Sequence, residues 1–226
     1  MLVFASSKPW SRTIVESHIC DFADDTMFVS TKPELLSAVN NKDVRMIFFL
    51  HWNWIVPKDV TDQIQCVCFH MTDLPFGRGG SPLQNLIVRG FKQTKLSAIR
   101  MTEELDAGPI YCKADLSLAG SALDIFVRAT HQSMLMAREI IENQLIPYEQ
   151  QGEVVHFERR RPLQSVLPSS VTLKELYDHI RMLDAPSYPP AFIESNDFRI
   201  EFHDAEFNDG NLTARVRINK IDKDNI

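Results

Sequence analysis

Short, nearly unbroken apolar segments alternate with amphipathic segments along the first 145 residues. Continuous apolar residues imply burial on both faces of a sheet. The segments predicted as strands on this basis are 1–5, 27–30, 44–50 and 66–70. Helices are predicted between them, first at about residues 10–22 and then from Thr31 onward. This alternation predicts an α/β fold with a doubly wound, mostly parallel, Rossmann-like sheet.

Three helix starts carry capping signals in the sequence, one of them Thr172, which is followed by Glu175 at the capping-box position. Thr31 is followed by Glu34 at the capping-box position, and Ser81 is followed by Pro82 in the first turn and by Gln84. Such a Ser or Thr satisfies backbone N–H groups that the first helical turn leaves without partners. A strand at 95–101 and a second from Ile110 are predicted to form a hairpin around the acidic turn 102–106.

The longest predicted helix runs from Ser121 to about residue 145. Apolar or small side chains recur along it at helical spacing, which predicts a face that packs on the sheet. The predicted stripe is Leu123, Phe126, Val127, Thr130, Met134, Ala137, Ile141 and Leu145. His131 lies beside this stripe and is interpreted as a structural histidine.

The character of the chain changes after Gly152, so two regions are predicted. Residues 1–155 form the catalytic domain, and residues 156–226 form a small C-terminal α+β region. The second region has a helix opening at Thr172, followed by alternating strands at 198–203 and 212–218. Asn208-Asp-Gly210 is typical of the turn in an antiparallel hairpin.

Composition is that of an ordinary globular protein, with 44% hydrophobic and 24% charged residues and a net charge of -6. This acidic balance argues against a broad nucleic-acid footprint, which needs clustered Lys and Arg. The basic run 159–161 is interpreted as a solvated loop. No apolar run approaches the roughly 18 residues of a membrane span, and no secretory signal is evident. A cytoplasmic protein is therefore expected.

Polar side chains gather where predicted strands end. His51-Trp-Asn-Trp54 follows a central strand, His70 ends the next, and Asp106 lies in the acidic turn. The carboxyl edge of an open α/β sheet is where ligands bind, and a His with an Asp suits general acid–base chemistry. Cys68 is a poor nucleophile candidate because apolar neighbours indicate burial. The thiols of the chain show no zinc-ligand spacing, so no metal is expected.

Three segments in order carry a family resemblance: His70-Met-Thr-Asp-Leu-Pro75, Gly77-Arg-Gly-Gly-Ser-Pro82 and Glu104-Leu-Asp-Ala-Gly-Pro-Ile110. Together they resemble the folate-dependent formyltransferase superfamily, which includes methionyl-tRNA formyltransferase. The resemblance covers roughly residues 44–150. Tyr188-Pro-Pro-Ala-Phe192 extends it and is most similar to the nucleotide-sugar N-formyltransferases.

The resemblance implies that His70 and Asp106 are the catalytic histidine and aspartate. The asparagine of the family motif has no match, since Cys68 stands in its place. An amide is needed there to donate a hydrogen bond to the developing oxyanion. Asn53, at the end of the adjacent strand, is predicted to replace it, with His51 as the second choice.

The resemblance also implies N10-formyltetrahydrofolate as co-substrate and no metal. The pterin is expected between the loops 51–56 and 103–108, in a pocket of apolar walls and a few polar groups. The residues assigned to it are Leu50, Trp52, Ile55, Met101, Glu103 and Asp106. Those assigned to the acceptor are Arg78, as a bidentate phosphate donor, with Gly79, Tyr188 and Phe192.

The leading functional hypothesis is formyl transfer to the amino group of a nucleotide-linked 4-amino-4,6-dideoxy sugar. Within this class, the expected acceptor is the UDP-linked 4-amino sugar of a pseudaminic-acid-type pathway. The expected partners are therefore a nucleotide sugar and a second copy of the chain, with no nucleic acid and no membrane. Methionyl-tRNA formylation is the same-family alternative, disfavoured because no extended cationic C-terminal face is evident. A non-catalytic folate- or nucleotide-binding relative is the other alternative, and Cys68 is the residue that favours it.

Overall fold

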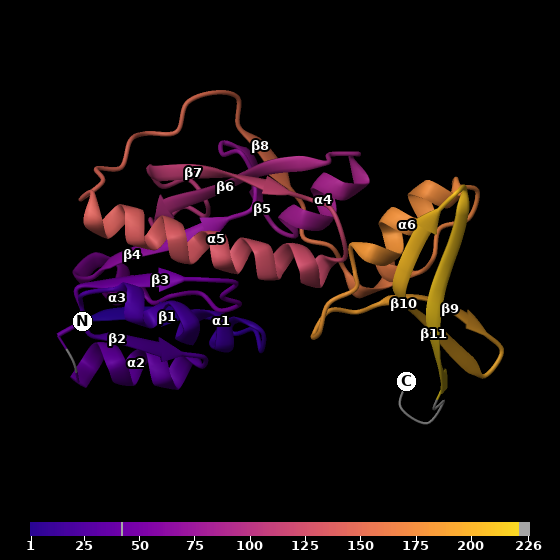
Figure 1. The fold of residues 1–226 in the computed structure, drawn as a ribbon, viewed down its shortest axis with the longest axis horizontal. Helices are drawn as coiled ribbons and strands as arrows, with labels where there is room; N and C mark the ends of the chain where they lie inside the picture. The colour runs from indigo at the N-terminus through magenta and orange to yellow at the C-terminus, as the bar shows by residue number, and fades with distance from the viewer. Residues whose placement is uncertain (42, 222–226) are drawn as a thin grey trace.

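A computed structural model describes residues 1–41 and 43–221. Its centre is a six-stranded sheet in which β6 is the strand that runs antiparallel to its neighbours. In spatial order the strands are β2 (Thr26–Val29), β1 (Leu2–Ala5), β3 (Met46–Phe49), β4 (Gln65–His70), β6 (Gln93–Arg100) and β7 (Ile110–Ser117). The predicted α/β class, the mostly parallel sheet and the β6–β7 hairpin are confirmed (Figure 1).

Alternate side chains of the central strands enter two apolar layers. Leu2 and Phe4 of β1 join the core on one face, while Val3 and Ala5 join the core on the other, as the period of two along a strand requires. The first layer is covered by α1 (Ser11–His18), α4 (Pro82–Val88) and α5 (Ala122–Glu142), and the second by α2 (Lys32–Asn41) and α3 (Lys58–Gln63). A 3₁₀ turn, η1 (Ile19–Asp21), extends α1.

The capping predictions succeed at two starts and fail at the third. At Thr172 the hydroxyl accepts from the Glu175 N–H at 3.2 Å, and the Glu175 carboxylate accepts from the Thr172 N–H at 2.7 Å. Glu34 accepts hydrogen bonds from the N–H groups of Ser30 and Thr31, and its own N–H donates to the Thr31 hydroxyl. Ser81 has a left-handed backbone and makes no capping hydrogen bond. Gln84 instead donates to the carbonyl of Met182, 3.1 Å away. The expected capping box at Ser81 is therefore wrong, because tertiary contacts take up both side chains.

Helix α5 packs on the sheet along a wider stripe than predicted. Phe126, Thr130, Met134 and Ala137 are buried as expected. Leu123, Val127, Ile141 and Leu145 are only half-buried. The buried face also includes Ala122, Ile125, Ala129, Ser133, Met136 and Ile140.

The C-terminal region forms a lobe beside the main body (Figure 1). It contains η2 (Pro162–Ser165), α6 (Leu173–Arg181), β9 (Ala191–Ser195), β10 (Phe198–Asn208) and β11 (Asn211–Lys220). Asp209 and Gly210 both have positive φ, which matches the predicted hairpin turn. Strands β5 (Phe76–Gly79) and β8 (Val155–Phe157) pair in parallel, so the boundary expected at residue 155, which stays a prediction, falls inside β8.

Short elements were not foreseen from the sequence. They are α3, β5 and β9, of six, four and five residues. No helix in the described part of the chain is long and apolar enough to cross a membrane.

Candidate active site

His70 ends β4 with its ring almost fully enclosed, at 8% exposure. Its Nε2 lies 2.8 Å from the carbonyl oxygen of Gly77. Because a carbonyl only accepts, Nε2 must carry a proton and donate it. The other ring nitrogen, Nδ1, is thereby left to face Asp106.

Asp106 meets His70 from the loop between β6 and β7. Its Oδ1 is 3.5 Å from His70 Nδ1, and its Oδ2 accepts a hydrogen bond of 3.0 Å from the N–H of Gly79. Asp106 has a positive φ of 54°, a conformation that Asp tolerates better than most residues. Two residues on, a Cβ at Gly108 would come within 1.8 Å of the Arg100 carbonyl oxygen. The Asp-Ala-Gly sequence thus follows from the shape of the loop.

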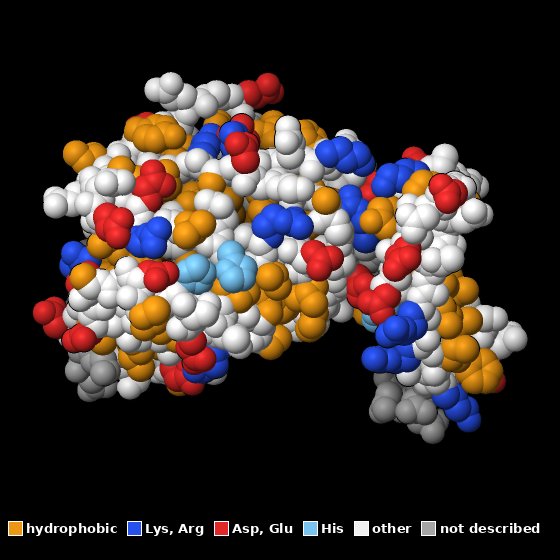
Figure 2. Space-filling model, in the orientation of Figure 1, with side chains coloured by type: hydrophobic (Ala, Val, Ile, Leu, Met, Phe, Trp, Pro, Cys, Tyr) orange, Lys and Arg blue, Asp and Glu red, His pale blue; other side chains and the backbone are white. Residues whose placement is uncertain are grey.

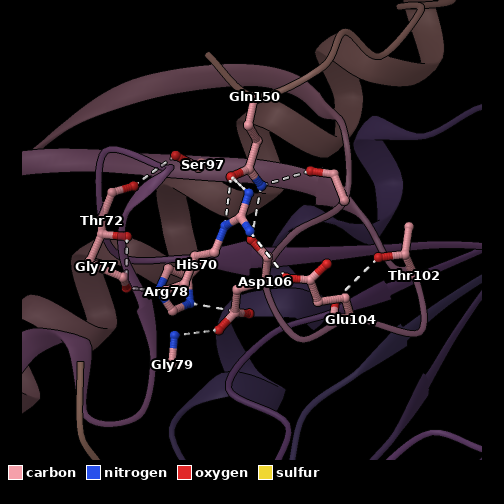
Figure 3. Close-up of polar contacts among 11 residues, drawn as sticks. His70, Thr72, Gly77, Arg78, Gly79, Ser97, Thr102, Glu104, Asp106 and Gln150 are labelled. Atoms are coloured by element: carbon pink, nitrogen blue, oxygen red, sulfur yellow. Dashed lines mark hydrogen bonds and ion pairs between the residues drawn. The ribbon is translucent and has the colours of Figure 1, made fainter. Parts of the chain in front are cut away.

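Two buried hydroxyl groups link the Gly77 carbonyl to the central sheet through hydrogen bonds. The Thr72 hydroxyl donates to the Gly77 carbonyl at 3.3 Å, and the Ser97 hydroxyl of β6 donates to the Thr72 carbonyl at 2.7 Å. Both side chains are fully buried. The segment whose carbonyl accepts the hydrogen bond from His70 is therefore held in place by the central sheet (Figure 3).

Gln150 joins the Asp106 loop to Arg78 (Figure 3). Its amide nitrogen donates to the carbonyls of Asp106 and Gly108, each at 2.8 Å. Its amide oxygen accepts from Arg78 Nε at 3.0 Å and from a terminal nitrogen at 2.8 Å. Arg78 also forms an ion pair with Glu104 at 3.3 Å. Its guanidinium is thus already bonded within the protein, whereas its assignment to a phosphate of the acceptor expected it to be available to a ligand.

Cys68 lies two residues before His70 on β4. Burial raises the pKa of its thiol, and the nearby Asp106 carboxylate raises it further. A thiol with a raised pKa stays protonated at neutral pH, so Cys68 is unsuited to nucleophilic attack. Its S–H is a weak donor and a poor substitute for an amide.

The two proposed replacements for the missing amide lie in different surroundings. Asn53 is exposed, and its side chain makes no hydrogen bond in the described part of the chain. His51 Nε2 lies 3.1 Å from the Thr130 hydroxyl, which itself donates to the Phe126 carbonyl. Burial lowers the pKa of His51 to about 4. Its proton is therefore held at Nε2 by Thr130, and Nδ1 has none to donate to an oxyanion.

The residues assigned to the pterin border two segments that approach each other. Lys58, at the start of α3, pairs with Glu103 at 3.3 Å, and Trp52 and Met101 pack on the same apolar layer. Trp52 Nε1 is buried without a hydrogen-bond partner among the described residues. Ile55 is 91% exposed, whereas Leu50 is 1% exposed. Leu50 is thus part of the core and presents almost no surface to a ligand.

Of the two aromatic residues assigned to the acceptor, only Tyr188 lies near the sheet edge. It stacks on Phe126 with ring centroids 5.2 Å apart, and the Lys8 ammonium lies 4.5 Å from its ring. Phe192 is 4% exposed on β9 and covered by the Arg199 guanidinium at 3.4 Å. Stacking of a base on Phe192 is therefore incompatible with its packing.

A polar cavity of about 320 Å³ lies beside this site. It is lined by Asn85, Arg89, His156, Glu158, Arg159, Arg160 and Gln164. None of its three arginines forms an ion pair within the described residues, and Arg160 Nε is buried without a partner. The Ser81 hydroxyl accepts from the Arg160 N–H at 3.0 Å, which places this wall two residues from Gly79. The basic run is thus part of a cavity, and Lys and Arg side chains are visible where the lobe joins the main body (Figure 2).

Comparison with known proteins shows which proteins share this sequence and fold. Residues 162–219 match the family model "Methionyl-tRNA formyltransferase, C-terminal domain". The structure of methionyl-tRNA formyltransferase from Clostridium thermocellum is 41% identical with a TM-score of 0.92, over 97% of this chain and 98% of that one. A 4-N formyltransferase from Francisella tularensis is 13% identical with a TM-score of 0.65, over 98% of both chains, a likeness that shows the fold alone.

Because the Clostridium thermocellum enzyme is 41% identical over nearly the whole of both chains, this sheet with its His–Asp pair belongs to the formyltransferase superfamily. Within it, the chain belongs to the methionyl-tRNA formyltransferase family. The methionyl-tRNA formyltransferase of Rickettsia typhi is 29% identical over 118 residues, which are 51% of this chain. The chain spans 38% of the length of that relative.

These relationships correct the partners expected from the sequence. The expectation of a nucleotide-sugar partner and of no nucleic acid is wrong, because the similar proteins are methionyl-tRNA formyltransferases. The pseudaminic-acid assignment likewise has no support among them. Tyr188-Pro-Pro-Ala-Phe192 misled because it lies in a segment that packs the lobe, and the acceptor does not follow from it.

Proposed function

We propose that this protein transfers a formyl group from N10-formyltetrahydrofolate to the amino group of methionyl-tRNA. The observation that carries the proposal is the buried His70–Asp106 pair, with 3.5 Å between Nδ1 and Oδ1, on a scaffold 41% identical to a methionyl-tRNA formyltransferase. A titratable pair enclosed at the carboxyl edge of the sheet suits proton transfer at a reacting amine.

The acceptor amine must lose a proton as its nitrogen bonds to the formyl carbon that the folate would supply. The bond between that carbon and N10 of the folate must break in exchange, and N10 must take up a proton, so that tetrahydrofolate leaves. In His70 the Nε2 proton is engaged by Gly77, so Nδ1 is the nitrogen that receives the proton. The Asp106 carboxylate next to Nδ1 stabilises the imidazolium that results. Asp106 itself is held in place by the Gly79 N–H.

Negative charge developing on the formyl oxygen needs a hydrogen-bond donor. Asn53 is our candidate, because its exposed amide has no partner in the described part of the protein and remains available to a ligand. His51 is less suitable, since its proton is held by Thr130.

The residues around loops 51–56 and 101–108 suit a pterin. Trp52 Nε1 is a buried donor without a partner, and Met101 is half-buried in the same apolar layer. Such a mixture of apolar surface and a few polar groups is typical of ligand sites. We assign Trp52, Met101, Ile55 and Glu103 to the folate, with Asp106 at its boundary.

A tRNA acceptor is supported by the family relationship and by the polar cavity. Arg89, Arg159 and Arg160 have no carboxylate partners within the described residues, and guanidinium groups are the side chains that best match phosphate oxygens. A local group of unpaired arginines is compatible with a net charge of -6 for the whole chain. Association with RNA depends on where positive charge is concentrated.

The decisive experiment incubates the purified chain with 10-formyltetrahydrofolate and initiator tRNA charged with methionine. Formylmethionine released from the tRNA is then measured by mass spectrometry. Uncharged tRNA and the His70→Asn variant serve as controls: the first is expected to yield no product, and the second to form it about 10²–10⁴-fold more slowly than wild type. Folate and tRNA binding without any product would instead support a non-catalytic relative, the reading that Cys68 favours. If only another amine were formylated, formyl transfer would stand as the reaction, and methionyl-tRNA would be refuted as its acceptor.

A further inference from the structure

Gln150 occupies the junction between the two segments that hold the catalytic pair. We propose that it is a positioning residue, which sets the Asp106 carboxylate against the His70 ring without contacting the substrate. The inference rests on the proposed function for its kinetic consequences, whereas the geometry that it concerns is independent of the acceptor.

The amide of Gln150 is used completely. Both of its N–H groups donate, to the carbonyls of Asp106 and Gly108, and its oxygen accepts twice from Arg78. An amide has two donors and two lone pairs, so nothing remains for a ligand. This exhaustion of its hydrogen-bonding capacity separates Gln150 from residues that bind substrate.

Both ends of the bridge lead directly to the catalytic pair. On one side Gln150 holds the backbone of Asp106, whose φ of 54° lies in the left-handed region. On the other side it holds Arg78, which stands between the carbonyl that accepts from His70 and the N–H that donates to Asp106. Movement of this bridge therefore displaces both partners of the pair relative to each other.

The backbone places Gln150 at this point independently of its side chain. Tyr148 pairs with Ile110 of β7 through hydrogen bonds of 2.7 and 2.9 Å. Gln150 follows two residues later, opposite the loop that precedes β7. Its location is thus fixed by the sheet, and a substitution of the side chain removes the bridge without removing this anchor.

Three variants test the proposal. Gln150→Ala removes all contacts of the amide. Gln150→Glu keeps an acceptor for Arg78 but puts a carboxylate beside two carbonyl oxygens. Gln151→Ala is the matched control, since Gln151 is exposed and has no partner in the described structure. Misplacement of a catalytic group by about 1 Å costs on the order of 10²-fold in rate. We expect kcat of both Gln150 variants to fall by about that factor, with KM within about twofold of wild type.

A spectroscopic measurement separates positioning from a merely structural role. The ring ¹⁵N signals of His70, assigned by comparison with His70→Asn, are expected to shift in both Gln150 variants and not in Gln151→Ala. Wild-type kcat with unshifted His70 signals would overturn the proposal, even if the melting temperature fell. Activity retained in Gln150→Glu alone would also overturn it, because anchoring of Arg78 would then suffice. If Gln150→Ala does not fold, Gln150→Glu decides alone.

The failure of the proposed function would be distinguishable. A wild-type protein that transfers no formyl group would contradict the function proposed above. The His70 signals would still report whether Gln150 sets the geometry of the pair, since they are recorded without any acceptor.

Discussion

His70 has the most exacting surroundings of any titratable side chain at the site. It is enclosed, its Nε2 donates to Gly77, and its Nδ1 faces Asp106. Replacement by Asn keeps a polar side chain but removes the nitrogen that takes the proton. We expect kcat to fall by about 10²–10⁴-fold, the usual contribution of a general acid–base group. Steady-state kinetics with charged tRNA measure it, and unchanged turnover would assign His70 a structural role.

Asn53 is tested by its conversion to Ala. The side chain has no partner within the described protein, so its loss should leave stability nearly unchanged. Removal of one oxyanion donor costs about 10²–10³-fold in kcat, and a fall of that order is expected. A change confined to KM would show that Asn53 orients the ligand and that another group supports the oxyanion.

At this scale, sequence motifs point to candidate catalytic residues but not to the residue proposed to position them. His70 and Asp106 follow from short segments with recognisable spacing. Gln150 lies 44 residues from Asp106 in a segment without a motif, and only the fold brings the two together. The assignment of Arg78 to a phosphate stays a prediction, and no sequence motif indicates that Gln150 and Glu104 already bond to its guanidinium.

Helix α5 spans one face of the sheet and begins with a complete capping box. Ser121 accepts from the Asp124 N–H at 3.2 Å, and the Asp124 carboxylate accepts from the Ser121 N–H at 2.8 Å. Ser121→Ala is expected to lower the free energy of unfolding by about 1 kcal/mol. Urea denaturation measures the change, with Ser195→Ala, at the exposed end of β9, as the control. Equal stability of the two variants would mean that packing alone maintains the first turn.

The sequence predicts elements well where local and tertiary preferences agree. Thr31, Ser121 and Thr172 begin helices at the expected positions. Ser81 fails as a cap because its hydroxyl is used by Arg160 and because Gln84 reaches Met182. Strand β5 is hidden in a Gly-rich turn whose extended form depends on pairing with β8, a partner distant in sequence.

The whole molecule should lose stability on acidification through His51. Burial lowers its pKa to about 4 from an ordinary value of 6.5. Because the folded state binds the proton less readily than the unfolded state, His51 favours folding above pH 6.5, and this contribution is lost as pH falls toward 4. At about 1.4 kcal/mol for each unit of pKa difference, the loss is at most about 3 kcal/mol. Between pH 7 and pH 4, the melting temperature of wild type should fall further than that of His51→Asn. Parallel curves would contradict this account.

Net charge is a property of the entire chain, whereas RNA responds to the local arrangement of phosphates and cations. The chain carries -6 overall, yet Arg89, Arg159 and Arg160 share one cavity wall without carboxylate partners in the described structure. If these arginines contact phosphates, each lost contact should reduce the slope of log affinity against log salt by about 0.7–0.9.

Arg159→Gln is the mildest test, because Arg159 is exposed and makes no hydrogen bond in the described part of the protein. Fluorescence anisotropy of tRNA binding over a range of salt concentrations gives the slope. Arg217→Gln, on exposed β11, removes the same charge far from the cavity and should leave the slope unchanged. Equal slopes for both variants would place the phosphates on another surface. A smaller slope for Arg159→Gln alone would place a phosphate at Arg159 and so assign the acceptor to this cavity, where positive charge is concentrated despite the net charge of -6.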